Sequence, residues 1–184
     1  MVEYRRNLPH WFPVVRPVFL TWRLHGSISS SVLAQLRDYR KYSAKEQFRA
    51  TEALLDRAEM GPLWLKDNRI AEEIVRKPRS GQRLKHYSLN AYVVMANHVH
   101  VLLTPKLDVH RITNSLKGTT AREPNRLLGR TGQPFWCEES FDRWIRDDDH
   151  FVRTKAYIER NPVKAHLVEK PEEWKWPSAH SKAK

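Results

Sequence analysis

Two histidines stand one residue apart in the apolar stretch YVVMANHVHVLLTP, residues 92–105. Side chains of a β-strand alternate between its faces, so His98 and His100 project from one face while Val99 and Val101 occupy the other. Imidazole in an apolar interior costs free energy unless its nitrogens are hydrogen-bonded or bind a metal ion. Two imidazoles at this spacing can share one divalent ion. The alternative is a pair of core histidines bonded to backbone or carboxylate groups, because nine histidines in 184 residues give about 0.4 such pairs by chance.

A second candidate group is Tyr157 with Asn161, one helical turn apart on a predicted helix, with Arg153 and Thr154 beside them. The apolar arc predicted for this helix consists of Phe151, Val152, Ala156 and Ile158. A tyrosine turned away from that arc, next to an amide and an arginine, suits contact with a phosphate. The alternative is an ordinary surface tyrosine.

The elements that must position these residues follow from periodicity and from Gly, Pro and capping residues. Strands are predicted at 18–26, 86–95 and 98–105, the last two joined by a turn near Ala96 and Asn97 or forming one long bent strand. Helices are predicted at 27–43, 44–59, 68–77, 108–117 and 147–161. Pro78 lies just beyond the third helix, Pro124 interrupts the pattern after the fourth, and Pro162 should end the last at Asn161. Residues 134–149 show no clean period. We therefore expect a single α+β domain over residues 1–184, with a polar, frayed tail from about residue 178.

The composition points to a polyanionic partner. Lys and Arg number 33 against 21 acidic residues, a formal charge of +12 that is spread along the whole chain. A folded basic domain of this kind most often binds nucleic acid, and a basic protein without that role is the alternative.

The single cysteine, Cys137, excludes an internal disulfide and suits a reducing compartment. The first residues show no apolar stretch of secretory length, and strands explain residues 88–105 better than a membrane span. A cytoplasmic protein is expected.

Together, YVVMANHVHVLLTP and YIERNPVKAHLV resemble the two motifs of the single-tyrosine HUH transposases, and most of all the REP-associated tyrosine transposases. Other segments are similar to that branch, including VFLTWRLHGS, GPLWLKDNRIAEEIV and EESFDRWIRDDDHF, so the resemblance extends from about Val18 to Trp176. Three positions depart from the family pattern: Ala96 replaces a common Pro, His166 replaces a common Gly, and the C-terminal WKWPSAH differs.

The resemblance implies a ferredoxin-like antiparallel sheet with helices on its faces and the HUH motif on a central strand. It implies that His98 and His100 bind a divalent metal ion, Mg²⁺ or Mn²⁺, that Asn161 is the third ligand, and that Tyr157 is the nucleophile. The implied activity is metal-dependent nicking and rejoining of single-stranded DNA at REP hairpins through a 5′-phosphotyrosine intermediate. Basic residues that fit a DNA track are Arg153, Lys117, Arg122, Arg126 and Arg130. We expect a monomer that joins the nucleoid when bound to DNA, with a dimer that exchanges the tyrosine helix as the alternative.

Two further functions remain open from the sequence. A domesticated relative could bind REP hairpins without cutting them. A metal-independent two-histidine phosphoesterase acting on RNA needs two His-x-Ser/Thr motifs, which His25 with Ser27 and His86 with Ser88 supply, although about one such motif is expected by chance. A structural metal site is disfavoured, because such sites usually close around four Cys or His ligands.

Overall fold

The sheet at the centre of the molecule has four strands in the order β2-β3-β1-β4, and each neighbouring pair is antiparallel. The computed structural model describes residues 16–36 and 42–176. The strands are β1 (Val18–Arg23), β2 (Tyr87–Val94), β3 (His98–Pro105) and β4 (Phe141–Trp144). The helices are α1 (Ser30–Leu36), α2 (Ala44–Arg57), α3 (Asn68–Arg83), α4 (Val109–Thr119), α5 (Arg122–Leu127) and α6 (Asp148–Lys164), with short 3₁₀ turns η1 (Trp64–Lys66) and η2 (Pro171–Glu173). This is the predicted α+β fold with the HUH motif on a central strand.

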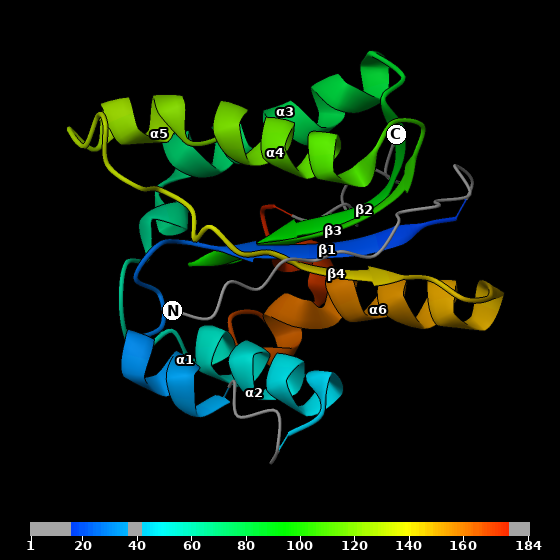
Figure 1. The fold of residues 1–184 in the computed structure, drawn as a ribbon, viewed down its shortest axis with the longest axis horizontal. Coiled ribbons are helices and arrows are strands. Elements are labelled where there is room, and N and C mark those ends of the chain that lie inside the picture. The colour runs from blue at the N-terminus through cyan, green and yellow to red at the C-terminus, as the bar shows by residue number, and fades with distance from the viewer. Residues whose placement is uncertain (1–15, 37–41, 177–184) are drawn as a thin grey trace, which may run out of the picture.

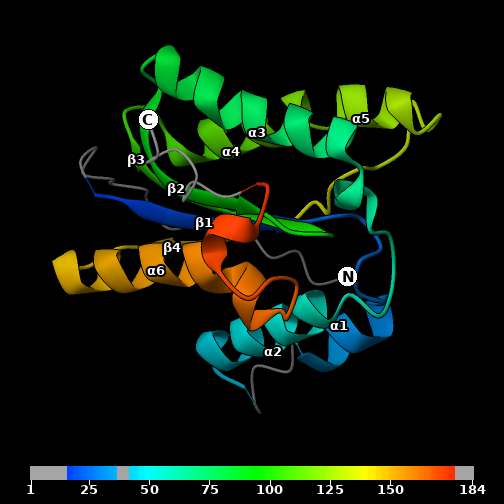
Figure 2. The same ribbon diagram turned by 180° about the vertical axis from the view of Figure 1, so that it is seen from behind.

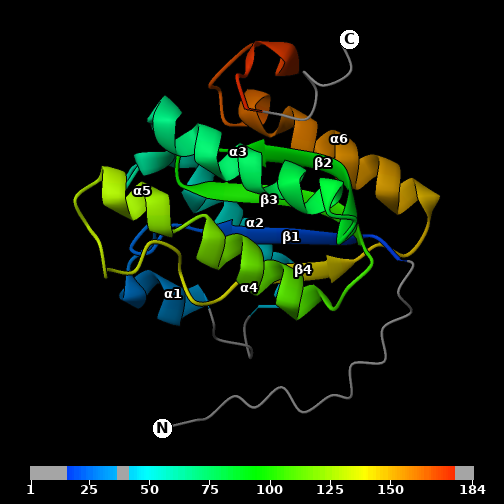
Figure 3. The same cartoon turned by 90° about the horizontal axis from the view of Figure 1, so that it is seen from above.

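Helices cover both faces of the sheet, so the molecule has three layers (Figure 1). Helices α3, α4 and α5 lie over one face, and α6 with α1 and α2 lies over the other (Figure 2). Seen from above, the strands run side by side between the helical layers (Figure 3). Alternate residues of β1 divide between the layers: Leu20 and Trp22 join the core under α3 and α4, whereas Phe19 joins the core under α6. A strand buried on both faces reads as a nearly continuous apolar run, as VFLTW does.

Capping residues begin the helices where the sequence predicts. The side chains of Ser43, Asp67, Asp108 and Asp147 accept hydrogen bonds from backbone N–H groups in the first turns of α2, α3, α4 and α6. Acceptors at this position satisfy donors that the helix leaves free. The helix starts near 44, 68, 108 and 147 are therefore confirmed.

Two prolines do not end their helices as predicted. Helix α3 continues through Pro78 to Arg83, and α6 continues through Pro162 to Lys164. A proline inside a helix removes one backbone donor, but both prolines are buried, and the packing of their helices outweighs that local cost. Just beyond the end of α6, His166 has a φ of 56°, in the left-handed region that favours glycine.

Other differences concern weakly patterned segments. Residues 86–105 form two strands, β2 and β3, rather than one bent strand. Strand β4 lies inside the stretch without a clean period, because all four of its residues are half-buried. The predicted apolar arc of α6 is partly wrong: Val152 is 64% exposed, while Thr154 and Asn161 are buried with Ile158. The predicted polar tail from about residue 178 and part of the predicted helix 27–43 lie outside the described residues.

Within the described parts of the chain, no helix combines the length and the apolar character that a membrane crossing requires.

Candidate active site

The two histidines of β3 lie beside β1 in the middle of the sheet. In the antiparallel register, Thr21 pairs with His100 and Arg23 with His98. Both imidazoles are completely buried, and Glu52 of α2 and Tyr157 of α6 contact His100 from the same side of the sheet. Their Nε2 atoms are 3.1 Å apart. The predicted same-face arrangement therefore brings the two rings into direct contact.

Neighbouring polar groups fix how each ring is turned. Nδ1 of His98 lies 2.7 Å from Oδ1 of Asn97, whose amide nitrogen donates to the Leu55 carbonyl at 3.1 Å. Because the Asn97 oxygen can only accept, Nδ1 of His98 carries the proton and its Nε2 presents a lone pair in the neutral ring. Nδ1 of His100 lies 2.8 Å from the Thr21 hydroxyl. Each ring is thus held through one nitrogen, which is how histidines that bind metal ions are usually oriented.

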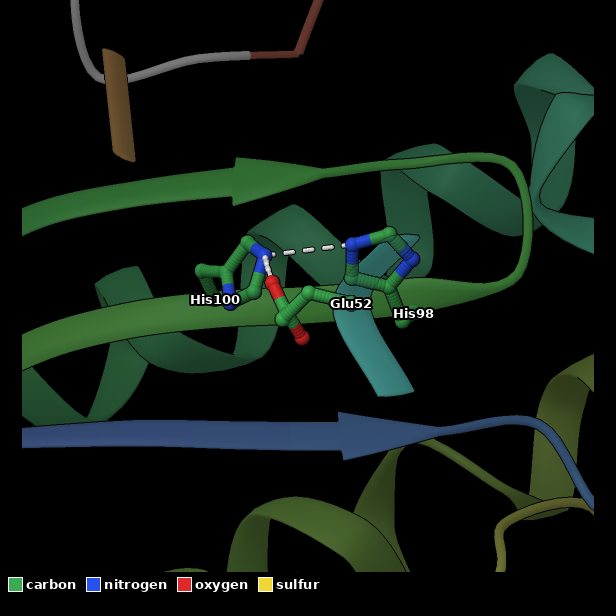
Figure 4. A group of neighbouring side chains, drawn as sticks. All are labelled: Glu52, His98 and His100. Carbon is green, nitrogen blue, oxygen red and sulfur yellow. Dashed lines mark hydrogen bonds and ion pairs between the residues drawn. The ribbon is translucent and has the colours of Figure 1, made fainter. Parts of the chain in front are cut away.

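A carboxylate that no sequence motif indicates, that of Glu52, completes the group. Glu52 reaches in from α2, is 2% exposed, and places Oε2 3.0 Å from Nε2 of His100. Figure 4 shows the carboxylate and the His98 ring both facing the His100 ring. One ligand atom from each of Glu52, His98 and His100 lies within 4.8 Å of the other two.

Tyr157 of α6 joins the same group. Its hydroxyl donates a hydrogen bond of 2.6 Å to Oε2 of Glu52, and its ring centroid lies 5.7 Å from that of His100. The tyrosine that was expected to point away from the apolar side of α6 is therefore turned inward, with its ring packed edge-on against Phe19.

The burial of these groups perturbs their pKa values. Burial lowers the pKa of His98 to about 3, and the neighbouring His100 acts in the same direction. Burial alone would raise the pKa of Glu52. The charge and hydrogen bond of His100, together with His98 and the hydrogen bond from Tyr157, outweigh it and lower that pKa to about 2. Burial, followed by the negative charge of Glu52, raises the pKa of the Tyr157 hydroxyl well above its ordinary value. The site thus contains an ionised carboxylate, a neutral imidazole and a protonated phenol.

The group fits a bound divalent cation. Nε2 of His98 is an acceptor, so a single proton on Nε2 of His100 has to serve both His98 at 3.1 Å and Glu52 at 3.0 Å. The second carboxylate oxygen of Glu52, Oε1, is buried and has no hydrogen-bond partner among the described residues. Imidazole nitrogen and carboxylate oxygen together are ligands for Mn²⁺, Co²⁺ or Zn²⁺. The predicted third ligand, Asn161, is also fully buried, and neither polar atom of its side chain is hydrogen-bonded within the described chain.

The predicted DNA-binding residues are not gathered at this site. Lys117 lies on α4 and both Arg122 and Arg126 on α5, across the sheet from the histidines (Figure 1). Arg126 forms an ion pair with Glu123, and Arg130 stacks on Trp64 with its guanidinium carbon 4.4 Å from the ring centroid. Arg153 is on α6, with a side chain that is 69% exposed.

One weak feature of the sequence could have indicated Glu52 as a site residue. It stands four residues after Phe48 and three before Leu55, so an acidic residue interrupts the apolar face of its helix. A buried acid on such a face needs a partner, but the partner is distant in sequence and cannot be read from the pattern.

The two His-x-Ser motifs of the phosphoesterase alternative lie at opposite ends of β3. Leu24, just before His25, bonds to Asn97 at the start of β3, whereas His86 bonds to Lys106 just after its end. A strand of eight residues spans about 25 Å. The motifs therefore cannot form one active site, and this alternative is not supported.

Comparison with known proteins points to one family. The family model described as Transposase IS200 like matches residues 63–161, a range that includes the histidines and Tyr157 but not α2. A solved structure described as a REP-associated tyrosine transposase bound to a REP hairpin covers 98% of this chain and 84% of its own, with 18% identity and a TM-score of 0.57. Another, a candidate transposase from Deinococcus radiodurans R1, covers 88% of this chain and 98% of its own, with 18% identity and a TM-score of 0.38. No curated protein sequence matches the chain.

Proposed function

Because this chain belongs to the IS200-like transposase family, we propose that it is a metal-dependent endonuclease and strand transferase that cuts single-stranded DNA hairpins through Tyr157. The observation that carries the proposal is the meeting of a phenol from α6 with two imidazoles from β3 at one buried carboxylate. A phosphodiester is a poor electrophile because its oxygens are negatively charged. The convergence of a nucleophile with cation ligands is what its cleavage requires.

His98, His100 and Glu52 would hold the divalent ion, since their ligand atoms already converge. Asn161 keeps its proposed role as a further ligand, supported by the burial of its unpartnered amide one turn after Tyr157. When bound, the ion supplies positive charge that withdraws electrons from a non-bridging phosphate oxygen and stabilises the phenolate. Mg²⁺ prefers oxygen ligands, whereas the two imidazoles suit Mn²⁺ better.

In the proposed reaction, the Tyr157 oxygen forms a bond to phosphorus and the bond from phosphorus to the 3′-oxygen breaks. The phenolic proton leaves along the hydrogen bond that the hydroxyl makes to Glu52, and the departing 3′-oxygen takes a proton from water. The products are a 5′-phosphotyrosine and a free 3′-hydroxyl. Because the phosphodiester bond is exchanged and not hydrolysed, a 3′-hydroxyl can reverse the step and rejoin strands without ATP.

The proposed partner is a REP-like hairpin, supported by the likeness of the fold to a transposase bound to one and by the charge of +12. Lys117, Arg122, Arg126 and Arg130 lie away from the histidines, so we propose that they contact the DNA backbone at a distance from the cleaved bond. Arg153 lies on the same helix as Tyr157 and would contact phosphates nearer to it. Such contacts set affinity and not sequence preference.

A monomer suffices for this chemistry, because Tyr157 meets the histidines of its own chain. A dimer that exchanges α6 is the alternative. For a protein that acts on chromosomal DNA we propose a cytoplasmic location, at the nucleoid when bound.

A nicking assay separates this enzyme from a hairpin-binding protein that does not cut. The full chain is incubated with Mn²⁺ and a single-stranded hairpin oligonucleotide labelled on both sides of the foot of the hairpin, and the products are separated under denaturing conditions. We expect a shortened 3′-hydroxyl strand and a protein-linked strand, both abolished by EDTA and by Tyr157→Phe. Hairpin binding by wild type without either product, across Mg²⁺ and Mn²⁺, would support the non-cutting alternative.

A further inference from the structure

A second carboxylate faces the imidazoles one turn after Glu52. Asp56 lies on α2 with a side chain that is 9% exposed, and its Oδ1 is 3.9 Å from Nε2 of His98. Its other oxygen, Oδ2, accepts a hydrogen bond of 2.7 Å from Nζ of Lys164. Residues four apart on a helix share a face, so Glu52 and Asp56 approach the two histidines together.

The environment of Oδ1 is unfavourable without a cation. This atom is buried and makes no hydrogen bond within the described chain, as is also true of Oε1 of Glu52. A buried acceptor without a donor destabilises the folded state. Nε2 of His98, which lies 3.9 Å from Oδ1, cannot supply a proton, because the proton of the neutral ring is on Nδ1, facing Asn97. Oδ1 of Asp56 therefore faces the lone pair on Nε2 of His98. The two atoms repel each other, but both would be attracted to a cation placed between them.

The distances suit three donors around one ion, those of Glu52, His98 and His100. Asp56 lies beside His98 but outside the group whose ligand atoms are all within 4.8 Å of one another, so its side chain has to turn towards the ion to bind it. Ligand atoms bound at about 2.1 Å lie about 3.0–3.4 Å apart when adjacent and up to about 4.2 Å apart when opposite. The separations of 3.1 Å between the two Nε2 atoms, 3.0 Å from His100 to Glu52 and 3.9 Å from His98 to Asp56 fall within this range. The charges also suit a cation, since the site has two carboxylates and, within the described chain, the ammonium group of Lys164 bonds to only one of them, Asp56.

We propose that Asp56 is a direct ligand of the ion. Two imidazoles and two carboxylates, with Asn161 as the further ligand already proposed, then form a site that binds Mn²⁺ before DNA arrives. The inference rests on the proposed function and adds a ligand from α2, which lies outside the range that matches the family model. A site with fewer protein ligands would depend on a phosphate oxygen of the substrate. With two carboxylates, the protein alone supplies enough negative charge to hold the ion.

Titration of the chelator-treated full chain with Mn²⁺ alone, without DNA, tests this inference. The electron paramagnetic resonance signal of free Mn²⁺ reports binding, and circular dichroism reports folding. We expect wild type to bind one equivalent and Asp56→Asn to bind at least ~10-fold more weakly, since even indirect partners of metal ligands contribute that much. Glu59→Gln, which alters an exposed carboxylate three residues away, should bind as wild type does.

Two further variants separate a ligand from a merely structural carboxylate. Lys164→Met removes the ion pair with Asp56 but leaves its oxygens in place, so Mn²⁺ binding should persist. Asp56→Cys replaces a hard ligand with a soft one and should lower the affinity for Mn²⁺ while keeping that for Cd²⁺. This second comparison still applies if Asp56→Asn fails to fold.

Equal Mn²⁺ affinity of Asp56→Asn and wild type would overturn the inference. So would an unchanged preference between Mn²⁺ and Cd²⁺ in Asp56→Cys, or a loss in Lys164→Met as large as that in Asp56→Asn. A wild-type protein that binds Mn²⁺ only with DNA would also overturn it. The proposed function stands or falls separately, on whether the labelled hairpin is nicked.

Discussion

The hydrogen bond between Tyr157 and Glu52 makes a quantitative prediction about stability. Tyr157→Phe removes only the hydroxyl, which donates at 2.6 Å to a carboxylate that is 2% exposed. A hydrogen bond to a charged group contributes about 1.5–3 kcal/mol. The acceptor keeps its contact with His100, so no oxygen that was bonded becomes wholly unpartnered. We therefore expect the metal-free variant to lose about 1.5–3 kcal/mol of unfolding free energy.

For a chain of this length, each kcal/mol corresponds to about 2–4 °C in Tm. The expected decrease is therefore about 3–12 °C, measured by thermal unfolding in EDTA. Tyr42→Phe is the matched control, because Tyr42 is 43% exposed, and it should change stability by no more than about 0.5 kcal/mol.

A double-mutant cycle with Glu52→Gln tests the partner. Without the charge on Glu52, removal of the Tyr157 hydroxyl should cost only about 0.5–1.5 kcal/mol, as for a neutral hydrogen bond. If Tyr157→Phe unfolds at the wild-type temperature, or costs the same in both backgrounds, the hydroxyl does not bind Glu52 in solution and the assembly of the site is wrong.

Two other predictions concern the histidines. The folded-state pKa of His98 is lowered from 6.5 to about 3, so below pH 6.5 the unfolded chain binds more protons than the folded one. The metal-free protein should therefore lose stability as the pH falls from 7 to 5, with His98 contributing up to about 1.4 kcal/mol per pH unit. Urea unfolding measures this loss, and a constant midpoint over that pH range would contradict a neutral, buried His98 ring. Thr21→Val removes the hydroxyl that contacts Nδ1 of His100 and should weaken Mn²⁺ binding about 10–100-fold in the same titration; unchanged affinity would show that Thr21 does not orient the ring.

The sequence predicts the central strand and its histidines because their signal is local. Alternation within β3 is enough to place His98 and His100 on one face, and Asp147 is enough to begin α6. The arrangement of the sheet around these histidines was predicted from the resemblance to the family. The prediction that Tyr157 points away from the apolar side of α6 is wrong. The apolar residues of α6 do not form a complete arc, and the contacts of Tyr157 with Phe19 and Glu52 determine how the helix is rotated.

The contribution of α2 could not be predicted in the same way. Glu52 and Asp56 meet the histidines only after two segments more than 40 residues apart in sequence come together. In the sequence, their carboxylates cannot be distinguished from those of solvent-exposed acidic residues on a helix surface. The helix ends predicted at Pro78 and Pro162 are wrong for a related reason. Tertiary packing of the two helices outweighs the local tendency of proline to end a helix.

Mass spectrometry of the covalent product tests the central claim most directly. The full chain is treated with Mn²⁺ and hairpin oligonucleotide, digested with protease and nuclease, and searched for a peptide that carries a 5′-linked nucleotide. We predict that the modification lies on the phenolic oxygen of Tyr157. Attachment to any other residue, or cleavage of the hairpin with no protein-linked product, would contradict it.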